Sequence, residues 1–120
     1  MDYPQKRRYD RVKETTYTTG TGAYLCGGAP VGARTFSSTV YDQEIFDYGV
    51  TEAGGPGWEN GIGRFNTITN TISRVHIYDS SNNNQPVNWG NEFKSIFLTV
   101  NAQSLTDIQD DVILGSLILG

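Results

Sequence analysis

The chain has 120 residues, a length typical of one domain, and its net charge of −4 disfavours binding of its body to nucleic acid. One cysteine excludes an intrachain disulfide, and no apolar stretch reaches the ~18 residues that a membrane span requires. Polar and charged residues follow Met1 directly, so the sequence predicts no signal peptide and synthesis in a cytoplasm.

The charge is divided unevenly along the chain. Residues 1–14 hold five cations and three acids, a net +2, whereas the remainder holds four cations and ten acids, a net −6. The cations assigned to a docking arm are Lys6, Arg7, Arg8 and Arg11. Two interpretations stay open for residues 1–9, namely an arm that docks on an acidic partner and a solvated, mobile terminus.

Residues 10–102 contain short runs that alternate in the period of a β-strand. The clearest are KSIFLTV, with Ile96, Leu98 and Val100 on one face, and EIFDYGV, in which apolar residues again recur at every second position. The Thr-rich residues 12–19 predict an edge strand, and AGGPG at 53–57 predicts a turn. The ranges predicted as strands are 12–19, 23–26, 34–40, 44–50, 58–65, 66–78 and 94–100.

These runs predict an all-β domain over residues 10–102, because seven or so short strands at regular spacing are typical of a β-sandwich or barrel. The glycines in WENGIGRF predict a bulge or a close approach of two backbones. The long run 66–78 predicts a single strand with a bend near Ser73.

An apolar segment follows at residues 103–120. Ser104 is a candidate helix cap, with Asp107 in the first turn. Left in water, the apolar side chains of this segment would favour aggregation, so we expect them to pack on the body or on a neighbouring subunit. The residues assigned to an oligomer interface are Val112, Ile113, Leu114, Leu117, Ile118 and Leu119.

Few residues suggest chemistry. Cys26 and His76 are the single cysteine and histidine, and a nucleophile–base pair would need them within hydrogen-bond reach. They cannot form a four-ligand zinc site, and Asp107, Asp110 and Asp111 lack the spacing of a calcium loop. The sequence therefore predicts no catalytic residue, no metal site and no cofactor.

One acid next to a tryptophan suggests a sugar site. Glu59 follows Trp58, and aromatic rings beside carboxylates suit carbohydrate binding or hydrolysis, although a tryptophan that anchors the core explains Trp58 more simply. The two candidate glycan contacts are Trp58 and Trp89.

Four blocks carry a resemblance that spans about residues 10–102: DRVKETTYTTGTGAYLCGGAPVGARTF, WENGIGRFN, TISRVHIYDSSNNNQPVNWG and KSIFLTVNA. Their order and spacing resemble a family of small phage and prophage structural proteins, whose β-domains occur alone or near the N-termini of tail-fibre-like proteins. The resemblance implies a virion component with a β-rich fold, made in a bacterial cytoplasm, and it brings no catalytic residues. Residues 1–9 and 103–120 lie outside it.

The resemblance and the residue patterns together lead to three expectations. The first is a non-enzymatic adaptor at the tail or fibre attachment region, with other virion proteins as partners and no nucleic acid or membrane. The second is a capsid decoration or cement protein, and the third is a host-surface carbohydrate-binding module. The chain is expected to form a homo-oligomer, with a trimer as the first guess.

Overall fold

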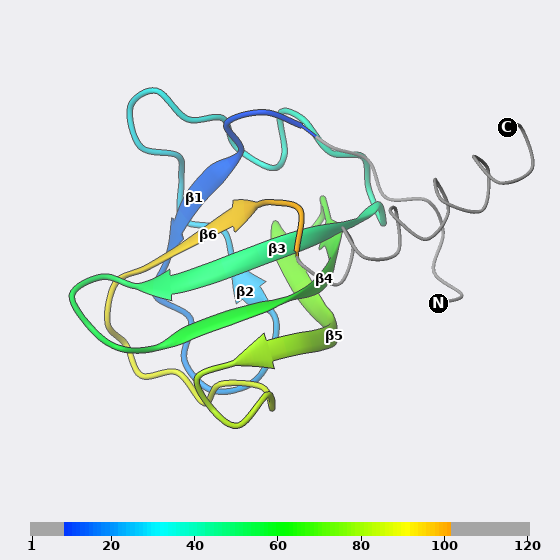
Figure 1. The fold of residues 1–120 in the computed structure, drawn as a ribbon. Helices are drawn as coiled ribbons and strands as arrows, with labels where there is room; N and C mark the ends of the chain where they lie inside the picture. Colours follow the sequence, from blue (N-terminus) through cyan, green and yellow to red (C-terminus); the bar gives the residue numbers. More distant parts are fainter. Residues whose placement is uncertain (1–8, 102–120) are drawn as a thin grey trace, which may run out of the picture.

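The computed structural model describes residues 9–101. Its strands are β1 (Lys13–Thr16), β2 (Tyr24–Leu25), β3 (Ile45–Glu52), β4 (Trp58–Asn66), β5 (Thr71–Ser80) and β6 (Lys94–Leu98). All neighbours are antiparallel, in the order β1-β6-β3-β4-β5-β2 (Figure 1). No helix occurs among residues 9–101, and the prediction of an all-β domain is confirmed.

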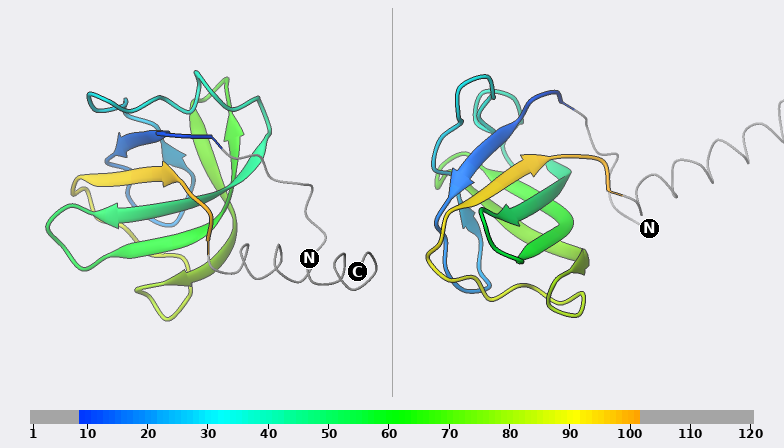
Figure 2. Two further views of the ribbon diagram at one scale, coloured as in Figure 1. Left: turned by 45° about the horizontal axis from the view of Figure 1, so that its top comes forward. Right: turned by 60° about the vertical axis from the view of Figure 1, so that its left-hand side comes forward.

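The sheet curves until its two outer strands nearly meet (Figure 2). Thr15 of β1 donates its N–H to the carbonyl of Gly28 at 2.9 Å and accepts the N–H of Gly27 at 2.7 Å. Gly27 and Gly28 follow β2 closely, so these two bonds bring the sheet close to a closed barrel. β1 is an edge strand of the sheet, as the sequence predicts, and residues 27–28 bond its outer side at Thr15, so that side is not left open.

The strand predicted at 34–40 does not form, which leaves six strands instead of about seven. The Val40 N–H donates to the Phe36 carbonyl at 2.9 Å, which makes a tight turn of these residues. The hydroxyls of Ser38 and Thr39 donate to the carbonyl of Thr35, at 2.9 Å and 3.0 Å. Such local bonds from Ser and Thr compete with strand pairing, and the turn still buries both Phe36 and Val40.

The single strand predicted at 66–78 is divided by a turn at residues 67–70. The Asn66 side-chain oxygen accepts the N–H groups of Ile68 and Thr69, and Asn70 has a φ of 55°. β5 starts after this turn, and its register with β4 shifts between Asn60 and Gly61 and between Ile62 and Gly63. The predicted bulge or close approach at these glycines is confirmed.

The barrel interior is filled from β3, β4 and the turn at 36–40. Phe46, Tyr48 and Val50 of β3 point inward, as their alternation predicts, and each is at most 1% exposed. The Phe36 ring stacks on Phe46, with centroids 5.2 Å apart. A Cβ on Gly61 would clash with the backbone carbonyl of His76 on β5 and would also lie 3.0 Å from the Tyr48 hydroxyl oxygen, so β4 needs glycine where it passes so close to β5.

Candidate functional site

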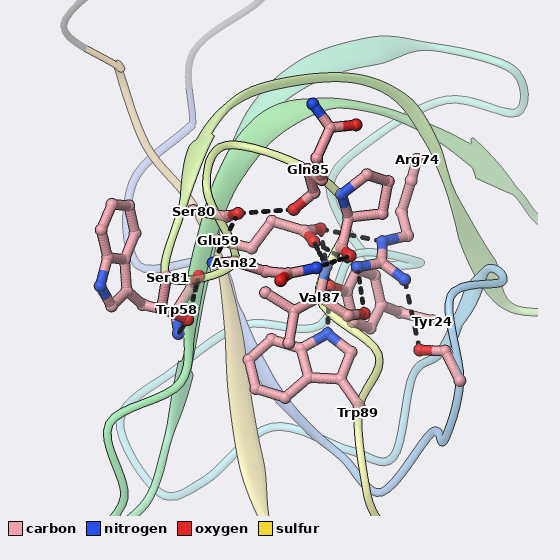
Figure 3. A network of polar contacts seen from close by, with 12 residues as sticks. Tyr24, Trp58, Glu59, Arg74, Ser80, Ser81, Asn82, Gln85, Val87 and Trp89 are labelled. Carbon is pink, nitrogen blue, oxygen red and sulfur yellow. Dashed lines mark hydrogen bonds and ion pairs between the residues drawn. The ribbon is translucent and has the colours of Figure 1, made fainter.

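One buried carboxylate organises the end of the barrel where β4 begins (Figure 3). Glu59 has no exposed surface, and its alternation with Trp58 places it on the inner face of β4. Its Oε2 accepts the hydroxyls of Tyr24 and Tyr48, at 2.7 Å and 2.6 Å. Its Oε1 accepts the backbone N–H of Val87 at 2.9 Å.

The counter-ion of Glu59 comes from β5. The Arg74 Nε donates to Glu59 Oε2 at 2.9 Å, and Nη2 donates to Oε1, so the pair is bidentate. The Arg74 side chain is only 4% exposed, and its guanidinium carbon lies 4.9 Å from the centre of the Tyr24 ring. A buried carboxylate with five donors has no remaining position for a further ligand.

Arg74 and Tyr24 connect this pair to two loops. The Arg74 guanidinium donates to the carbonyl of Val87 at 2.8 Å and to that of Gly20 at 3.4 Å. The Trp89 indole N–H donates to the Tyr24 hydroxyl at 2.7 Å. The network therefore holds the loops at residues 20–22 and 87–89 against the barrel. Within residues 9–101, the only strand-type pairing of these two loops is the bridge between Gly20 and Trp89.

The electrostatics of the network favour the ionised carboxylate. Burial alone would raise the pKa of Glu59, but the hydrogen bonds from Arg74, Tyr48, Val87 and Tyr24 outweigh burial and lower it. Burial, followed by the charge of Glu59, raises the pKa of the Tyr24 and Tyr48 phenols, which stay protonated as donors. Glu59 therefore carries no proton that it could give to a substrate, and we assign the network to holding the fold.

A second buried carboxylate lies where the barrel closes. Glu14 of β1 is 2% exposed, and its two oxygens accept the N–H groups of Gly28 at 2.9 Å and Phe36 at 2.8 Å. Cys26 lies beside it, and burial first and the Glu14 charge second raise the pKa of the thiol. Glu14 thus fixes the backbone of residues 28–36 across the seam between β1 and β2.

A buried cation closes the start of β6. Lys94 has no exposed surface, and its Nζ donates to the carbonyls of Gly90 at 2.9 Å and Glu92 at 2.6 Å. The ammonium lies 5.5 Å from the centre of the Trp89 ring. Burial lowers the pKa of Lys94, and the carboxylates of Glu92 and Glu52 oppose that shift.

The two predicted glycan contacts lie in opposite environments. Trp89 is 4% exposed and belongs to the core cluster, so its prediction as a glycan contact is wrong. Its indole N–H donates to the Tyr24 hydroxyl inside the barrel. Trp58 is 38% exposed on the outer face of β4 and is not the core anchor that the sequence favours. The alternation of WENG contains the reason, because burying Glu59 turns Trp58 outward.

The pair Cys26 and His76 receives no support as a nucleophile and base. Cys26 is buried in the core cluster, whereas His76 is exposed on β5 with its ring 5.2 Å from that of Tyr78. Across residues 9–101 no three His, Cys, Asp or Glu side chains are grouped to hold a metal ion, and no helix there could cross a membrane.

Several predicted residues lie outside the described part of the chain. Of the predicted docking arm, only Arg11 is described: it is exposed, and its Nε donates to the Gly32 carbonyl at 2.7 Å. The arm residues Lys6, Arg7 and Arg8 and the predicted interface residues Val112, Ile113, Leu114, Leu117, Ile118 and Leu119 are not described.

Comparisons with known proteins give no relative. No family model, no curated protein and no solved structure matches this chain.

Proposed function

We propose that this chain is a non-enzymatic structural protein of a bacteriophage particle that acts as an adaptor in the tail or fibre attachment region. The proposal rests on the resemblance of residues 10–102 to small phage and prophage structural proteins. The buried charged groups add support, because Glu59, Glu14 and Lys94 are all engaged in holding loops and strands together. Its partners would be other virion proteins.

The observation that carries the adaptor role is the position of Tyr9 and Asn101, the first and last described residues, on the barrel. The Tyr9 hydroxyl donates to the carboxylate of Glu44, with 3.1 Å to Oε1, directly before β3. The Asn101 N–H donates to Asp47 Oδ2 of β3 at 3.2 Å. The basic arm precedes Tyr9 and the apolar segment follows Asn101, so both are attached beside the start of β3. Two segments of different chemistry at one end suit a protein that joins neighbours.

A place on the capsid, as a decoration or cement protein, is the second candidate. The same two segments would then dock on the shell, and residues 103–120 provide no shaft or coiled-coil repeat that would extend a fibre. The apolar segment favours a homo-oligomer, and a trimer remains the first expectation.

A third candidate is a carbohydrate-binding module on the outer face of the barrel. Tyr17 is 59% exposed and packs edge-on against Phe93, with ring centroids 5.8 Å apart. Trp58 lies on the same outer face. It is paired with Thr51 of β3, and Thr51 is paired in turn with Ser95 of β6. Exposed aromatic rings near hydroxyl side chains suit a sugar. A glycan array would test it, with Trp58→Ala expected to abolish any signal and Tyr41→Ala as the control.

Quantitative mass spectrometry of purified particles tests the main proposal. We expect the chain in particles at a copy number close to that of the tail proteins. A copy number close to that of the capsid protein would replace the adaptor with the decoration protein. Absence from particles, when tail and capsid proteins are both detected, would overturn both.

A further inference from the structure

An open hollow on the outside of the barrel lies where β1 meets β6. Its volume is about 270 Å³, and it is bounded on one side by the loop after β2. The residues that line it are Arg11, Val12, Lys13, Gly32, Ala33, Phe97 and Leu98. These seven lining residues, all within the described range, include two cations and no acid, although the chain as a whole is acidic.

The strand register explains how cations and apolar side chains come together here. Lys13 of β1 is paired with Phe97 of β6, and both side chains lie on the outer face, opposite to the buried neighbours Glu14 and Ile96. The Arg11 Nε donates to the Gly32 carbonyl at 2.7 Å, which fixes the guanidinium at the rim. The hollow therefore combines a cationic rim with an apolar floor.

One segment of this chain has the complementary pattern. Residues 107–114 read DIQDDVIL, in which Asp107, Asp110 and Asp111 are followed directly by three apolar residues. Carboxylates would meet Arg11 and Lys13, and the apolar side chains would cover Phe97 and Leu98. The N-terminal arm is excluded as the occupant by its positive charge, because like charges in contact are strongly unfavourable.

The path of the chain after β6 favours the segment of a second copy. The Asn101 side-chain amide donates to the carbonyls of Tyr48 at 3.4 Å and Gly61 at 3.0 Å, which belong to β3 and β4. β3 lies on the side of β6 that faces away from β1, so the chain leaves Leu98 in the direction opposite to the hollow.

We propose that residues 107–114 of one copy dock in the β1–β6 hollow of the next copy, with the three aspartates on Arg11 and Lys13. The inference rests on the proposed self-association of the chain and names the surface that receives the apolar segment. A contact between two different surfaces joins copies head to tail, and such contacts close into a ring when the rotation between copies permits it.

Charge reversal in the full-length chain tests the proposal, with association followed by sedimentation velocity over a range of concentrations. The hollow variant carries Arg11→Glu and Lys13→Glu, and the segment variant carries Asp107→Lys, Asp110→Lys and Asp111→Lys. Each alone should associate at least about tenfold more weakly than the wild type, because opposite charges become like charges. Arg64→Glu, an exposed cation on the outer face of β4, is the matched control and should leave association unchanged.

Mixing the two variants gives the decisive result. Equal amounts should associate with each other, because each acidic hollow then meets a basic segment. Circular dichroism checks that both variants are folded. If the hollow variant does not fold, the single substitution Lys13→Glu replaces it. If the wild type associates and the hollow variant matches it, or if mixing restores nothing, the proposed contact is wrong while self-association stands. A monomeric wild type would overturn both.

Discussion

Glu59 and Glu14 are both buried carboxylates, yet a guanidinium, two phenols and one backbone N–H hold the first, whereas two backbone N–H groups hold the second. Glu59 lies where β4 begins and gathers side chains from β2, β3 and β5 around one point. Glu14 lies at the seam and gathers the backbone of residues 28–36, which carries no strand of its own.

The difference follows from what each region lacks. The end of the barrel near Glu59 is bounded by long loops, and Arg74 and Trp89 fix these through side chains. The seam has only short strands, since β1 has four residues and β2 two, so bonds from Glu14 to the backbone replace missing ladder bonds. This small barrel therefore uses a buried ion pair to hold its loops and a second buried carboxylate to hold its seam.

Removing the cation should have the largest effect. Arg74→Met leaves Glu59 buried without its counter-ion, and the expected loss of unfolding free energy is about 3–5 kcal/mol. Urea unfolding followed by tryptophan fluorescence measures it, because Trp89 belongs to the same network. Arg64→Met, on the exposed face of β4, is the matched control and should change stability by less than about 0.5 kcal/mol. Equal losses of unfolding free energy in the two variants would contradict a central role of the Arg74–Glu59 ion pair in stability.

The seam should respond less. Glu14→Gln keeps one acceptor oxygen and leaves the N–H of either Gly28 or Phe36 without its partner, at an expected cost of about 1–3 kcal/mol. Hydrogen exchange locates the effect: the amides of Gly28 and Phe36 should exchange faster, and those of β4 should not. A uniform increase across the whole barrel would mean that the seam and the Glu59 end open together.

Acid should destabilise the fold by protonating Glu59, because the pKa of this carboxyl is lower in the folded chain than in the unfolded chain. A carboxyl that is more acidic in the folded chain stabilises the fold above its ordinary pKa of about 4.3, and this contribution is lost as the pH falls through the lower folded value. Unfolding free energy should therefore decrease as the pH falls below about 4.3, and less steeply in Glu59→Gln. The same slope in both proteins would assign the acid sensitivity to other carboxylates.

Alternation along the chain was enough to predict β3, β4 and β6, because each has one face inside the barrel. It failed at 34–40, where Phe36 and Val40 lie four residues apart and fit a tight turn as well as one face of a strand. It could have placed Arg74 inward, two residues after the buried Ile72. It could not have joined Arg74 to Glu59, because that pairing depends on the register of β4 and β5 and on the shifts at Gly61 and Gly63.

The smallest expected effect concerns the thiol at the seam. Burial raises the pKa of Cys26, and the Glu14 charge raises it further, so the thiol is neutral at physiological pH and reacts slowly with iodoacetamide in the folded chain. Glu14→Gln removes the second cause and leaves the first, so we expect labelling to become several-fold faster while staying well below the rate of the unfolded chain. Mass spectrometry of the labelled protein over time gives both rates, and Glu59→Gln is the control, because its carboxylate is no cause of the Cys26 shift. Faster labelling in Glu59→Gln as well would show that opening of the barrel, and not the neighbouring charge, limits the reaction. The seam and the loop end would then open together, so the two buried carboxylates would differ in their hydrogen-bond partners but not in the motion that they restrain.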